Sequence, residues 1–226
     1  TISADLIKYF KNKEEIFTNG DTSAIINSEY NFQSRDVIFL KNLMELISNQ
    51  NSTITDKHNL YNLAKFKYLI NEKELRGEKI IISSNYKSPK SDKFYLSSGI
   101  INLGSQDFIA KDTKIKIHKD IFNEPENDPR LYGVSSFKKG QITQVNKGVF
   151  TSCKDNGDDC PPWSIKASQI KHDKNKKQLI YENAIVRIYN FPVFYFPKFF
   201  HPDPTVKRQS GFLMPQINSS EELGDS

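Results

Sequence analysis

The chain has 226 residues, of which 37% are hydrophobic and 26% are charged, and its formal net charge is +5. This composition excludes an intrinsically disordered chain, and the lack of any run of 18 apolar residues excludes a transmembrane helix. The mild excess of lysine favours anionic partners without naming one, and a solvated lysine-rich surface is the simpler interpretation.

Short β-strands are the elements that the sequence predicts. Runs rich in Ile, Val, Phe, Tyr and Thr recur between clusters of Gly, Asn, Asp and Lys. Asp36–Ser48 could be read with helical spacing, but its neighbours are strand-like and we expect strand there. Further strands are predicted at Glu78–Ser84, Lys93–Leu103, Phe108–Ile117, Gly148–Thr151, Trp163–His172, Gln178–Tyr189 and Val193–Phe199. Asp120–Pro129, with two prolines and several polar residues, is predicted to be a loop.

An internal repeat relates two distant segments of the chain. Ala4–Ile16 aligns with Ala167–Leu179 at a constant offset, and each copy reads as a strand, a Lys/Asn turn and a second strand. Weaker copies are expected at Asn62–Ile82 and Lys93–Ile117. Chance similarity among Lys- and Asn-rich turns is the alternative. A hairpin cannot bury its apolar face alone, so several copies must stack.

Stacked hairpins with one apolar face indicate the architecture. They form a β-roll or a folded-over sheet, and if the two margins do not close, the inner face becomes an apolar groove. We therefore predict an all-β fold, an open β-jellyroll of the kind called a β-taco. In Ala184–Tyr189 the alternation of side chains places Ala184, Val186 and Ile188 inward and Arg187 toward water.

Two cysteines, Cys153 and Cys160, enclose a polar loop. Their spacing matches no zinc pattern, and it favours a small disulfide loop in an oxidising compartment. Two free thiols in a cytosolic protein are the alternative. Trp163, the only tryptophan, is predicted to anchor the core beside this loop.

The sequence shows no signature of catalysis or metal binding. His58, His118, His172 and His201 are scattered without metal-ligand spacing, and we interpret them as surface or core residues. No Ser-His-Asp order, Gly-rich phosphate loop or paired-carboxylate signature stands out. We therefore predict that the chain is not an enzyme, needs no metal or cofactor, and binds no nucleic acid.

The last third of the chain carries motifs that point to a family. In chain order these are Phe150–Cys153, Trp163–Ala167, Asn183-Ala184, Pro192–Pro197 and Lys207–Pro215. Over about residues 130–220 the sequence resembles the LptD family of LPS-assembly proteins, also called OstA or organic solvent tolerance proteins. Over residues 1–130 only the looser OstA-type strand repeat is similar.

This resemblance implies a location at the outer membrane of Gram-negative bacteria. Family members have a periplasmic β-jellyroll, which accepts lipopolysaccharide from a periplasmic bridge, and an outer-membrane β-barrel plugged by the lipoprotein LptE. Residues 1–200 would then be the periplasmic jellyroll domain. Residues 201–226 would be a linker and the start of the first barrel strand, near Ser210–Pro215, in a fragment that lacks the barrel. The bridge protein LptA is expected to dock on an exposed N-terminal edge strand near Ser3–Phe10.

The cysteines depart from the family pattern. The family cysteine at Cys153 pairs with a cysteine of the barrel in well-studied members. Here Cys160 offers a nearby partner. Local pairing, pairing with the barrel, or exchange between the two are the alternatives.

The ligand that the resemblance implies has acyl chains and a phosphorylated head. Burying each CH₂ group stabilises by about 0.8 kcal/mol, so several long chains cannot cross the periplasm bare, and non-directional burial lets them slide along an apolar groove. The residues predicted to line this groove are Ile165, Ala167, Ile170, Leu179, Ala184, Val186, Ile188, Val193 and Tyr195. The predicted phosphate contacts at its rim are Lys166, Lys171 and Arg187, with a solvated surface as the alternative. Ordinary core packing, in a scaffold β-roll that binds no lipid, is the competing hypothesis.

Overall fold

The computed structural model describes residues 1–118, 127–155, 161–203, 205–206, 219–220 and 224–225. Within these residues every regular element is a β-strand. The first nine strands are β1 (Ile2–Phe10), β2 (Glu15–Ile26), β3 (Tyr30–Arg35), β4 (Ile38–Leu40), β5 (Glu45–Ser48), β6 (Ser52–Thr55), β7 (Leu60–Leu63), β8 (Lys65–Leu69) and β9 (Glu74–Ser83). The others are β10 (Lys93–Asn102), β11 (Phe108–Lys116), β12 (Asn127–Lys139), β13 (Ile142–Cys153), β14 (Trp163–Asp173), β15 (Gln178–Ile188), β16 (Phe191–Pro202), β17 (Ser219–Ser220) and β18 (Gly224–Asp225).

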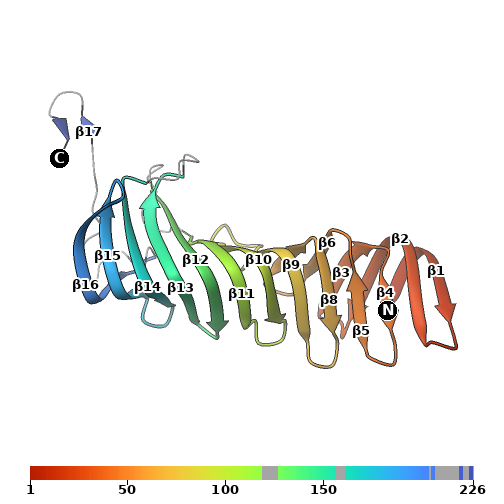
Figure 1. Cartoon of the computed structure of the whole chain (residues 1–226). Helices are drawn as coiled ribbons and strands as arrows, with labels where there is room; N and C mark the ends of the chain where they lie inside the picture. Colours follow the sequence, from red (N-terminus) through yellow and green to blue (C-terminus); the bar gives the residue numbers. More distant parts are fainter. Residues whose placement is uncertain (119–126, 156–160, 204, 207–218, 221–223, 226) are drawn as a thin grey trace.

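A single antiparallel sheet contains strands β1 to β16 (Figure 1). From β9 onward each strand pairs with the next one along the chain. Before β9 the sheet has two branches, because β2 pairs with both β3 and β4, and β9 pairs with both β7 and β8. The strands of one branch are β3, β6 and β7, and those of the other are β4, β5 and β8.

These two branches continue as the two halves of the long strands. The first wing comprises β3, β6, β7 and the halves of the later strands that contain Ile82, Phe94, Phe150 and Ile165. The second wing comprises β4, β5, β8 and the halves that contain Leu75, Phe108, Tyr181 and His201. The sheet is therefore folded along its length, and the two wings face each other as in the predicted β-jellyroll.

The fold line between the wings is a row of residues with left-handed backbone. Lys79, Asp112, Lys147 and Asn183 have φ angles of 49°, 45°, 47° and 51°, and they lie in the alternate strands β9, β11, β13 and β15. The paired strands keep their register across each of these positions, so the bend comes from the left-handed backbone and not from an extra residue. Close packing at this line also requires glycine, because a Cβ atom on Gly133 would lie 2.1 Å from Cγ1 of Val145.

The predicted hairpin repeat is confirmed at both of its main copies. Residues 11–14 connect β1 to β2, and residues 174–177 connect β14 to β15. Both four-residue turns end in a left-handed residue, Glu14 with a φ of 52° and Lys177 with a φ of 51°. The two segments thus share one turn geometry as well as one sequence pattern.

Neighbouring turns of this kind are hydrogen-bonded to one another. The amide nitrogen of Lys41 donates to the carbonyl oxygen of Glu14 at 3.0 Å, and that of Ile70 donates to Met44 at 2.9 Å. Toward the other end of the roll, the amide nitrogen of Asp203 donates to the carbonyl oxygen of Lys177 at 2.9 Å. The turns at the margin of the second wing therefore form a ladder of their own.

Most predicted strands are confirmed, and one prediction is wrong in part. Asp36–Ser48 forms the hairpin of β4 and β5, as expected for strand. The predicted loop Asp120–Pro129 falls largely on residues 119–126, which lie outside the described residues, but Asn127–Pro129 belong to β12. The expected start of a barrel strand, Ser210–Pro215, also lies outside the described residues. The large sheet itself extends to Pro202.

The core lies between the wings and is rich in aromatic side chains. Three pairs of rings join the first wing to the second at successive points along the roll. These pairs are Phe32 with Phe66 at 5.6 Å, Phe94 with Phe108 at 5.6 Å, and Phe150 with Tyr181 at 6.3 Å between ring centroids. The apolar interior is therefore continuous from β3 to β15.

Candidate functional site

The structure brings most of the predicted groove residues together on the inner face. Five of them are at most 4% exposed and belong to the core: Ile165, Ala167, Ile170, Leu179 and Ala184. Val186 is half-buried and packs against that core. Ile188 is 40% exposed, but it pairs with buried Trp163 and so lies on the same face at the margin of the first wing.

Two predicted groove residues on β16, Val193 and Tyr195, are 42% and 59% exposed, and Tyr195 lies on the outer face. Tyr195 pairs with Ile185 of β15, and Ile185 pairs on its other side with the exposed Lys166 of β14. The hydroxyl of Tyr195 donates a hydrogen bond to Oδ1 of Asn183 at 3.0 Å. The residues of β16 that share the inner face are the partners of Val186, Ala184, Tyr181 and Leu179, namely Phe194, Phe196, Phe199 and His201. The structure thus places Tyr195 away from the interior. The inward face changes beside Asn183, which has a φ of 51°, while β15 and β16 keep their register there.

A hollow opens on the inner face where the margins of the two wings approach each other. Its apolar lining comes from Tyr61, Ile82 and Phe94 of the first wing and from Ile101 and Phe108 of the second. The volume of the hollow is about 360 Å³. Because these side chains belong to the continuous core, the hollow connects that core with the outside. We refer to it below as the mouth hollow.

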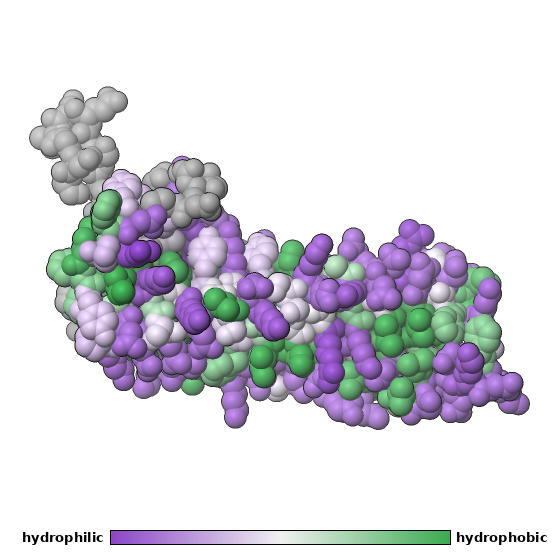
Figure 2. All heavy atoms as spheres, in the orientation of Figure 1, coloured by the Kyte–Doolittle hydropathy of each residue, from purple (hydrophilic) through white to green (hydrophobic). Residues whose placement is uncertain are grey.

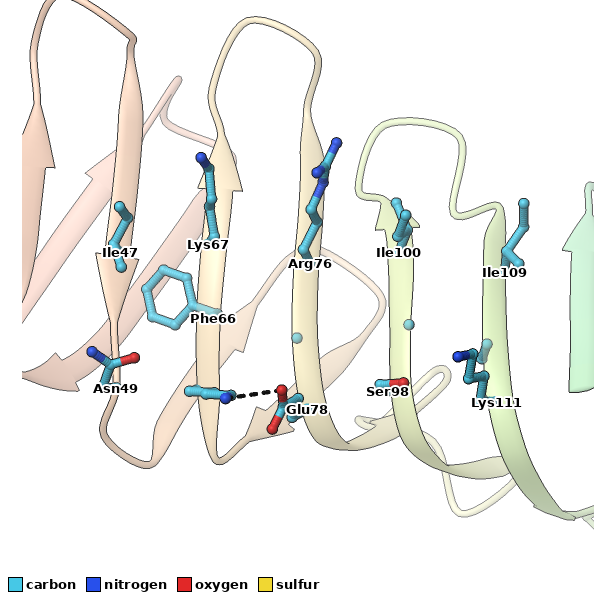
Figure 3. Close-up of a pocket in the computed structure, with 14 residues that line it drawn as sticks. Ile47, Asn49, Phe66, Lys67, Arg76, Glu78, Ser98, Ile100, Ile109 and Lys111 are labelled. Atoms are coloured by element: carbon cyan, nitrogen blue, oxygen red, sulfur yellow. Dashed lines mark ion pairs between the residues drawn. The ribbon is translucent and has the colours of Figure 1, made fainter.

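A second, larger trough of about 500 Å³ crosses the outer face of the sheet (Figure 3). Its walls are two rows of outward side chains, with Ile100 and Ile109 in one row and Glu78 and Lys111 in the other. The amino group of Lys65 lies 2.9 Å from the carboxylate of Glu78. The backbone of Gly77 and Gly99 forms the floor, so the sheet separates this trough from the interior.

A buried polar network closes the interior near the end of β16. The Nδ1 atom of His201 lies 2.7 Å from the carbonyl oxygen of Pro202, and its Nε2 atom lies 2.7 Å from the hydroxyl of Tyr181. Because a carbonyl can only accept, Nδ1 carries the proton and Nε2 accepts from Tyr181. Burial lowers the pKa of His201 to about 4, so the ring is neutral at pH 7.

The same region contains a hydrogen bond between His172 and Asp203, both of which are buried. Asp203 also accepts a hydrogen bond from the amide nitrogen of Thr205 at 2.7 Å. Burial alone would raise the pKa of Asp203, but the hydrogen bonds from His172 and Thr205 lower it to about 2. The expectation that the histidines are surface or core residues therefore holds for His172 and His201.

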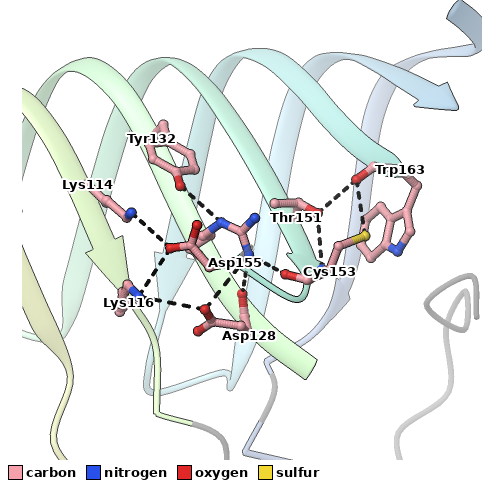
Figure 4. Close-up of polar contacts among 9 residues, drawn as sticks. Lys114, Lys116, Asp128, Tyr132, Thr151, Cys153, Asp155 and Trp163 are labelled. Atoms are coloured by element: carbon pink, nitrogen blue, oxygen red, sulfur yellow. Dashed lines mark hydrogen bonds and ion pairs between the residues drawn. The ribbon is translucent and has the colours of Figure 1, made fainter. Parts of the chain in front are cut away.

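Arg130 organises a polar cluster at the end of β13 (Figure 4). Its buried guanidinium donates to the carbonyl oxygens of Cys153 and Asp128 and to the hydroxyl of Tyr132. Next to it, Asp155 lies 3.0 Å from the amino group of Lys114. The hydrogen bond from Lys114 is the main reason why the pKa of Asp155 falls to about 2. The cluster holds the backbone of Cys153 in place.

Cys153 itself lies half-buried beside the only tryptophan. Its Sγ atom is 3.8 Å from the carbonyl oxygen of Trp163, and the indole packs against Phe150. Trp163 is buried, as predicted for an anchor of the core next to the cysteine loop. Cys160 lies outside the described residues, so its pairing with Cys153 stays a prediction.

Both ends of the sheet carry exposed apolar side chains (Figure 2). At one end β1 pairs only with β2 and exposes Leu6, Ile7, Tyr9 and Phe10. At the other end β16 pairs only with β15, and its exposed apolar side chains include Phe191, Phe194, Tyr195 and Phe200. Within the described residues each of these strands leaves one edge of its backbone unpaired. Such edges can accept a strand from another chain.

Two negative findings apply to the described part of the chain. It contains no cluster of three or more His, Cys, Asp or Glu side chains that could hold a metal ion. Nor does it contain a helix long and apolar enough to span a membrane.

No family model matches the chain, but it is similar to several curated proteins. It is 34% identical over 86 residues to the LPS-assembly protein LptD of Xanthomonas oryzae pv. oryzae, which is 38% of this chain and 10% of that protein. It is 31% identical over 119 residues to LptD of Hahella chejuensis, covering 53% of this chain and 14% of that protein. With LptD of Vibrio cholerae the identity is 25% over 181 residues, or 76% of this chain and 23% of that protein.

The matched region is a small part of these relatives, since it spans between 10% and 23% of their length. Such partial coverage fits an N-terminal domain. The family resemblance that we inferred from the last third of the sequence is confirmed by these similarities.

Proposed function

We propose that this LptD-like chain is the jellyroll segment of an outer-membrane lipopolysaccharide-assembly protein, and that it holds the acyl chains of the lipid between its two wings. The observation that supports this most strongly is the apolar interior, which is continuous from β3 to β15 and reaches the outside at the mouth hollow. The relatives are named for LPS assembly, which supplies the class of ligand. On this proposal the chain acts as a conduit and not as an enzyme.

The volume of the hollow limits how much lipid can lie there without a change in the protein. A space of 360 Å³ corresponds to about twelve water-sized groups, at about 30 Å³ each. The protein's own side chains occupy the rest of the interior. Several acyl chains therefore require the wings to separate, and their burial, at about 0.8 kcal/mol per CH₂, must offset the loss of contacts between the wings.

A scaffold that binds no lipid is the second candidate function. The observation that favours it is the close packing in β14 and β15, where Ile165, Ile170 and Ala184 are 4%, 0% and 0% exposed. In this case the interior serves only to hold the wings together.

The single tryptophan offers a direct test of the conduit. A lipid A analogue with brominated acyl chains, added to the full chain, should quench the fluorescence of Trp163, because that side chain lies in the interior. The control is a double variant, Trp163→Phe with Ile185→Trp, which moves the indole to the outer face. Equal quenching at both positions, or none at Trp163 while the analogue co-sediments with the protein, would support the scaffold instead.

The family resemblance also supports a periplasmic location for this segment and three partners in the whole protein: lipopolysaccharide, the bridge protein LptA, and the lipoprotein LptE at the barrel. A disulfide of Cys153 with Cys160 or with a barrel cysteine belongs to the same proposal. The exposed edge of β1 is the surface that we assign to LptA, because its backbone is unpaired and its side chains are apolar.

Deleting residues 1–10 should reduce LptA binding at least tenfold, since strand addition to a sheet edge depends on main-chain hydrogen bonds. Binding can be measured by titrating labelled LptA into the full chain and into the deletion variant. Phe191→Asp, at the opposite edge, is the control and should bind LptA normally. Unchanged binding by the deletion variant would exclude β1 as the docking strand.

A further inference from the structure

An ion pair joins the two wings across the open side of the roll. Lys174, the first residue of the turn between β14 and β15, extends its amino group to Oδ2 of Asp92. Asp92 precedes β10 at the margin of the first wing, and its Oδ1 accepts a hydrogen bond from the amide nitrogen of His118 at 2.8 Å. Because the two residues belong to opposite margins, their ion pair fastens one wing to the other.

This ion pair lies at the mouth hollow, and Lys174 is one of the residues that line it. Lys138 lines it as well, and its amino group donates to the carbonyl oxygen of Gln106 at 2.9 Å. Burial lowers the pKa of Lys138. The negative charge of Asp107 raises this pKa, and the positive charge of Lys174 lowers it further. The two ammonium groups are therefore close enough to repel each other.

The polar groups of the hollow suit an anion. Among its described lining residues there are two lysines and a histidine, His58, but no Asp or Glu. Below them lies the apolar surface of Ile82, Phe94 and other core residues. A cationic rim over an apolar floor is complementary to a molecule with an anionic head and an alkyl chain.

We propose that the mouth hollow is a lateral port for a phosphorylated amphiphile, which lays its alkyl chain on the apolar floor and its phosphate on Lys138 and Lys174. In the closed state the carboxylate of Asp92 forms an ion pair with the amino group of Lys174. The phosphate replaces this carboxylate, so that one ion pair is exchanged for another and the margins are released. This inference rests on the proposed function and adds to it the place, the charged residues and the closing contact.

Calorimetric titration of the full chain with dodecyl phosphate, below its micellar concentration, tests the port. Lys138→Gln and Lys174→Gln should each weaken binding about tenfold, the usual effect of losing one charge-assisted hydrogen bond. Lys174→Arg should retain binding. Asp92→Asn should strengthen it several-fold, because Lys174 is then free for the phosphate. Lys176→Gln, an exposed position in the same turn, is the matched control and should change nothing.

Two further ligands identify what the port recognises. Inorganic phosphate and the uncharged dodecyl maltoside should both bind much more weakly than dodecyl phosphate. Equal binding of phosphate alone, or binding that the two Gln variants do not affect, would overturn the proposal. So would an Asp92→Asn variant that melts at the normal temperature but binds no more tightly. If Asp92→Asn fails to fold, the binding of dodecyl phosphate by Lys174→Arg and by the two Gln variants decides whether the proposal holds.

The port and the conduit can fail separately. If the brominated lipid still quenches Trp163 in a Lys138→Gln, Lys174→Gln double variant as it does in the unmodified chain, the lipid reaches the interior by another route. The port is then wrong and the conduit stands. If dodecyl phosphate binds in a lysine-dependent way but brominated lipid never quenches Trp163, the port stands and the conduit is wrong.

Discussion

Replacing Phe150 with alanine is expected to lower the free energy of unfolding by about 3–5 kcal/mol, the usual range for a fully buried phenylalanine. Phe150 is 0% exposed, and its ring centroid lies 5.0 Å from that of His201 and 6.3 Å from that of Tyr181. Because Phe150 belongs to the first wing and its two partners to the second, the substitution leaves a cavity between the wings. Urea denaturation followed by the fluorescence of Trp163 measures the change.

A phenylalanine outside the core provides the control. Phe191 is 74% exposed on β16, so Phe191→Ala should change the free energy of unfolding by no more than about 0.5 kcal/mol. A loss below about 1 kcal/mol for Phe150→Ala would mean that the aromatic contacts do not hold the wings together.

Replacing His172 with alanine should cost about 3 kcal/mol, because it removes the partner of a buried carboxylate. Asp203 is 4% exposed, and without His172 its carboxylate keeps the hydrogen bonds from Thr205. Chemical denaturation at pH 7 gives the value. His58→Ala, which alters an exposed histidine, should have little effect on stability.

The same pair predicts how stability depends on acid. The pKa of Asp203 in the folded chain is about 2, below the value of about 3.9 expected for an unfolded aspartate. Its stabilising contribution, of about 2 kcal/mol, is therefore complete above about pH 4 and is lost as the pH falls through about 2. In His172→Ala this loss should largely disappear. An unchanged profile below about pH 4 would show that the pair does not control acid stability.

His201 contributes in a different pH range. Burial lowers its pKa to about 4, so protonation favours the unfolded chain. Stability from the neutral ring is complete above about pH 6.5 and falls as the pH drops toward about 4. The two contributions can therefore be separated in one titration of unfolding free energy against pH.

Much of the fold could be predicted because local patterns determine it. The alternation of apolar residues located the strands, and the repeated Lys/Asn turns predicted hairpins that the structure confirms. Glu14 and Lys177 take the same left-handed conformation although their side chains differ in charge. The repeat is thus a repeat of backbone geometry, which the shared turn sequence was sufficient to reveal.

The groove residues of β16 could not be predicted from alternation alone. Nearly every residue from Phe191 to Phe200 is apolar or proline, so neither face is marked by polarity. Only pairing with β15 shows that Phe196 and Phe199 share a face although three positions separate them. The change of face lies beside Asn183, whose φ is 51°, and the register of the two strands is kept there, so counting by twos back from Phe199 reaches Tyr195 on the outer face.

The contacts across the margins also have no local signal. Asp92 and Lys174 are ordinary charged residues of turns in the sequence, and they meet only because the sheet folds along its length. The contact of His172 with Asp203 likewise joins β14 to the residue that follows β16, although β15 lies between these two strands in the sheet. Long-range polar contacts of this kind required the structure.

Photo-crosslinking along β14 would test most directly whether lipid lies between the wings. A compact diazirine amino acid is placed in turn at Ile165, Lys166, Ala167 and Ser168 of the whole protein in cells, and adducts with lipopolysaccharide are measured after irradiation. Ile165 and Ala167 face inward, whereas Lys166 and Ser168 are exposed. We expect the yield to alternate, with adducts from the first two positions and little from the others. Equal yields from both faces, or no adduct from Ile165 and Ala167, would contradict the account.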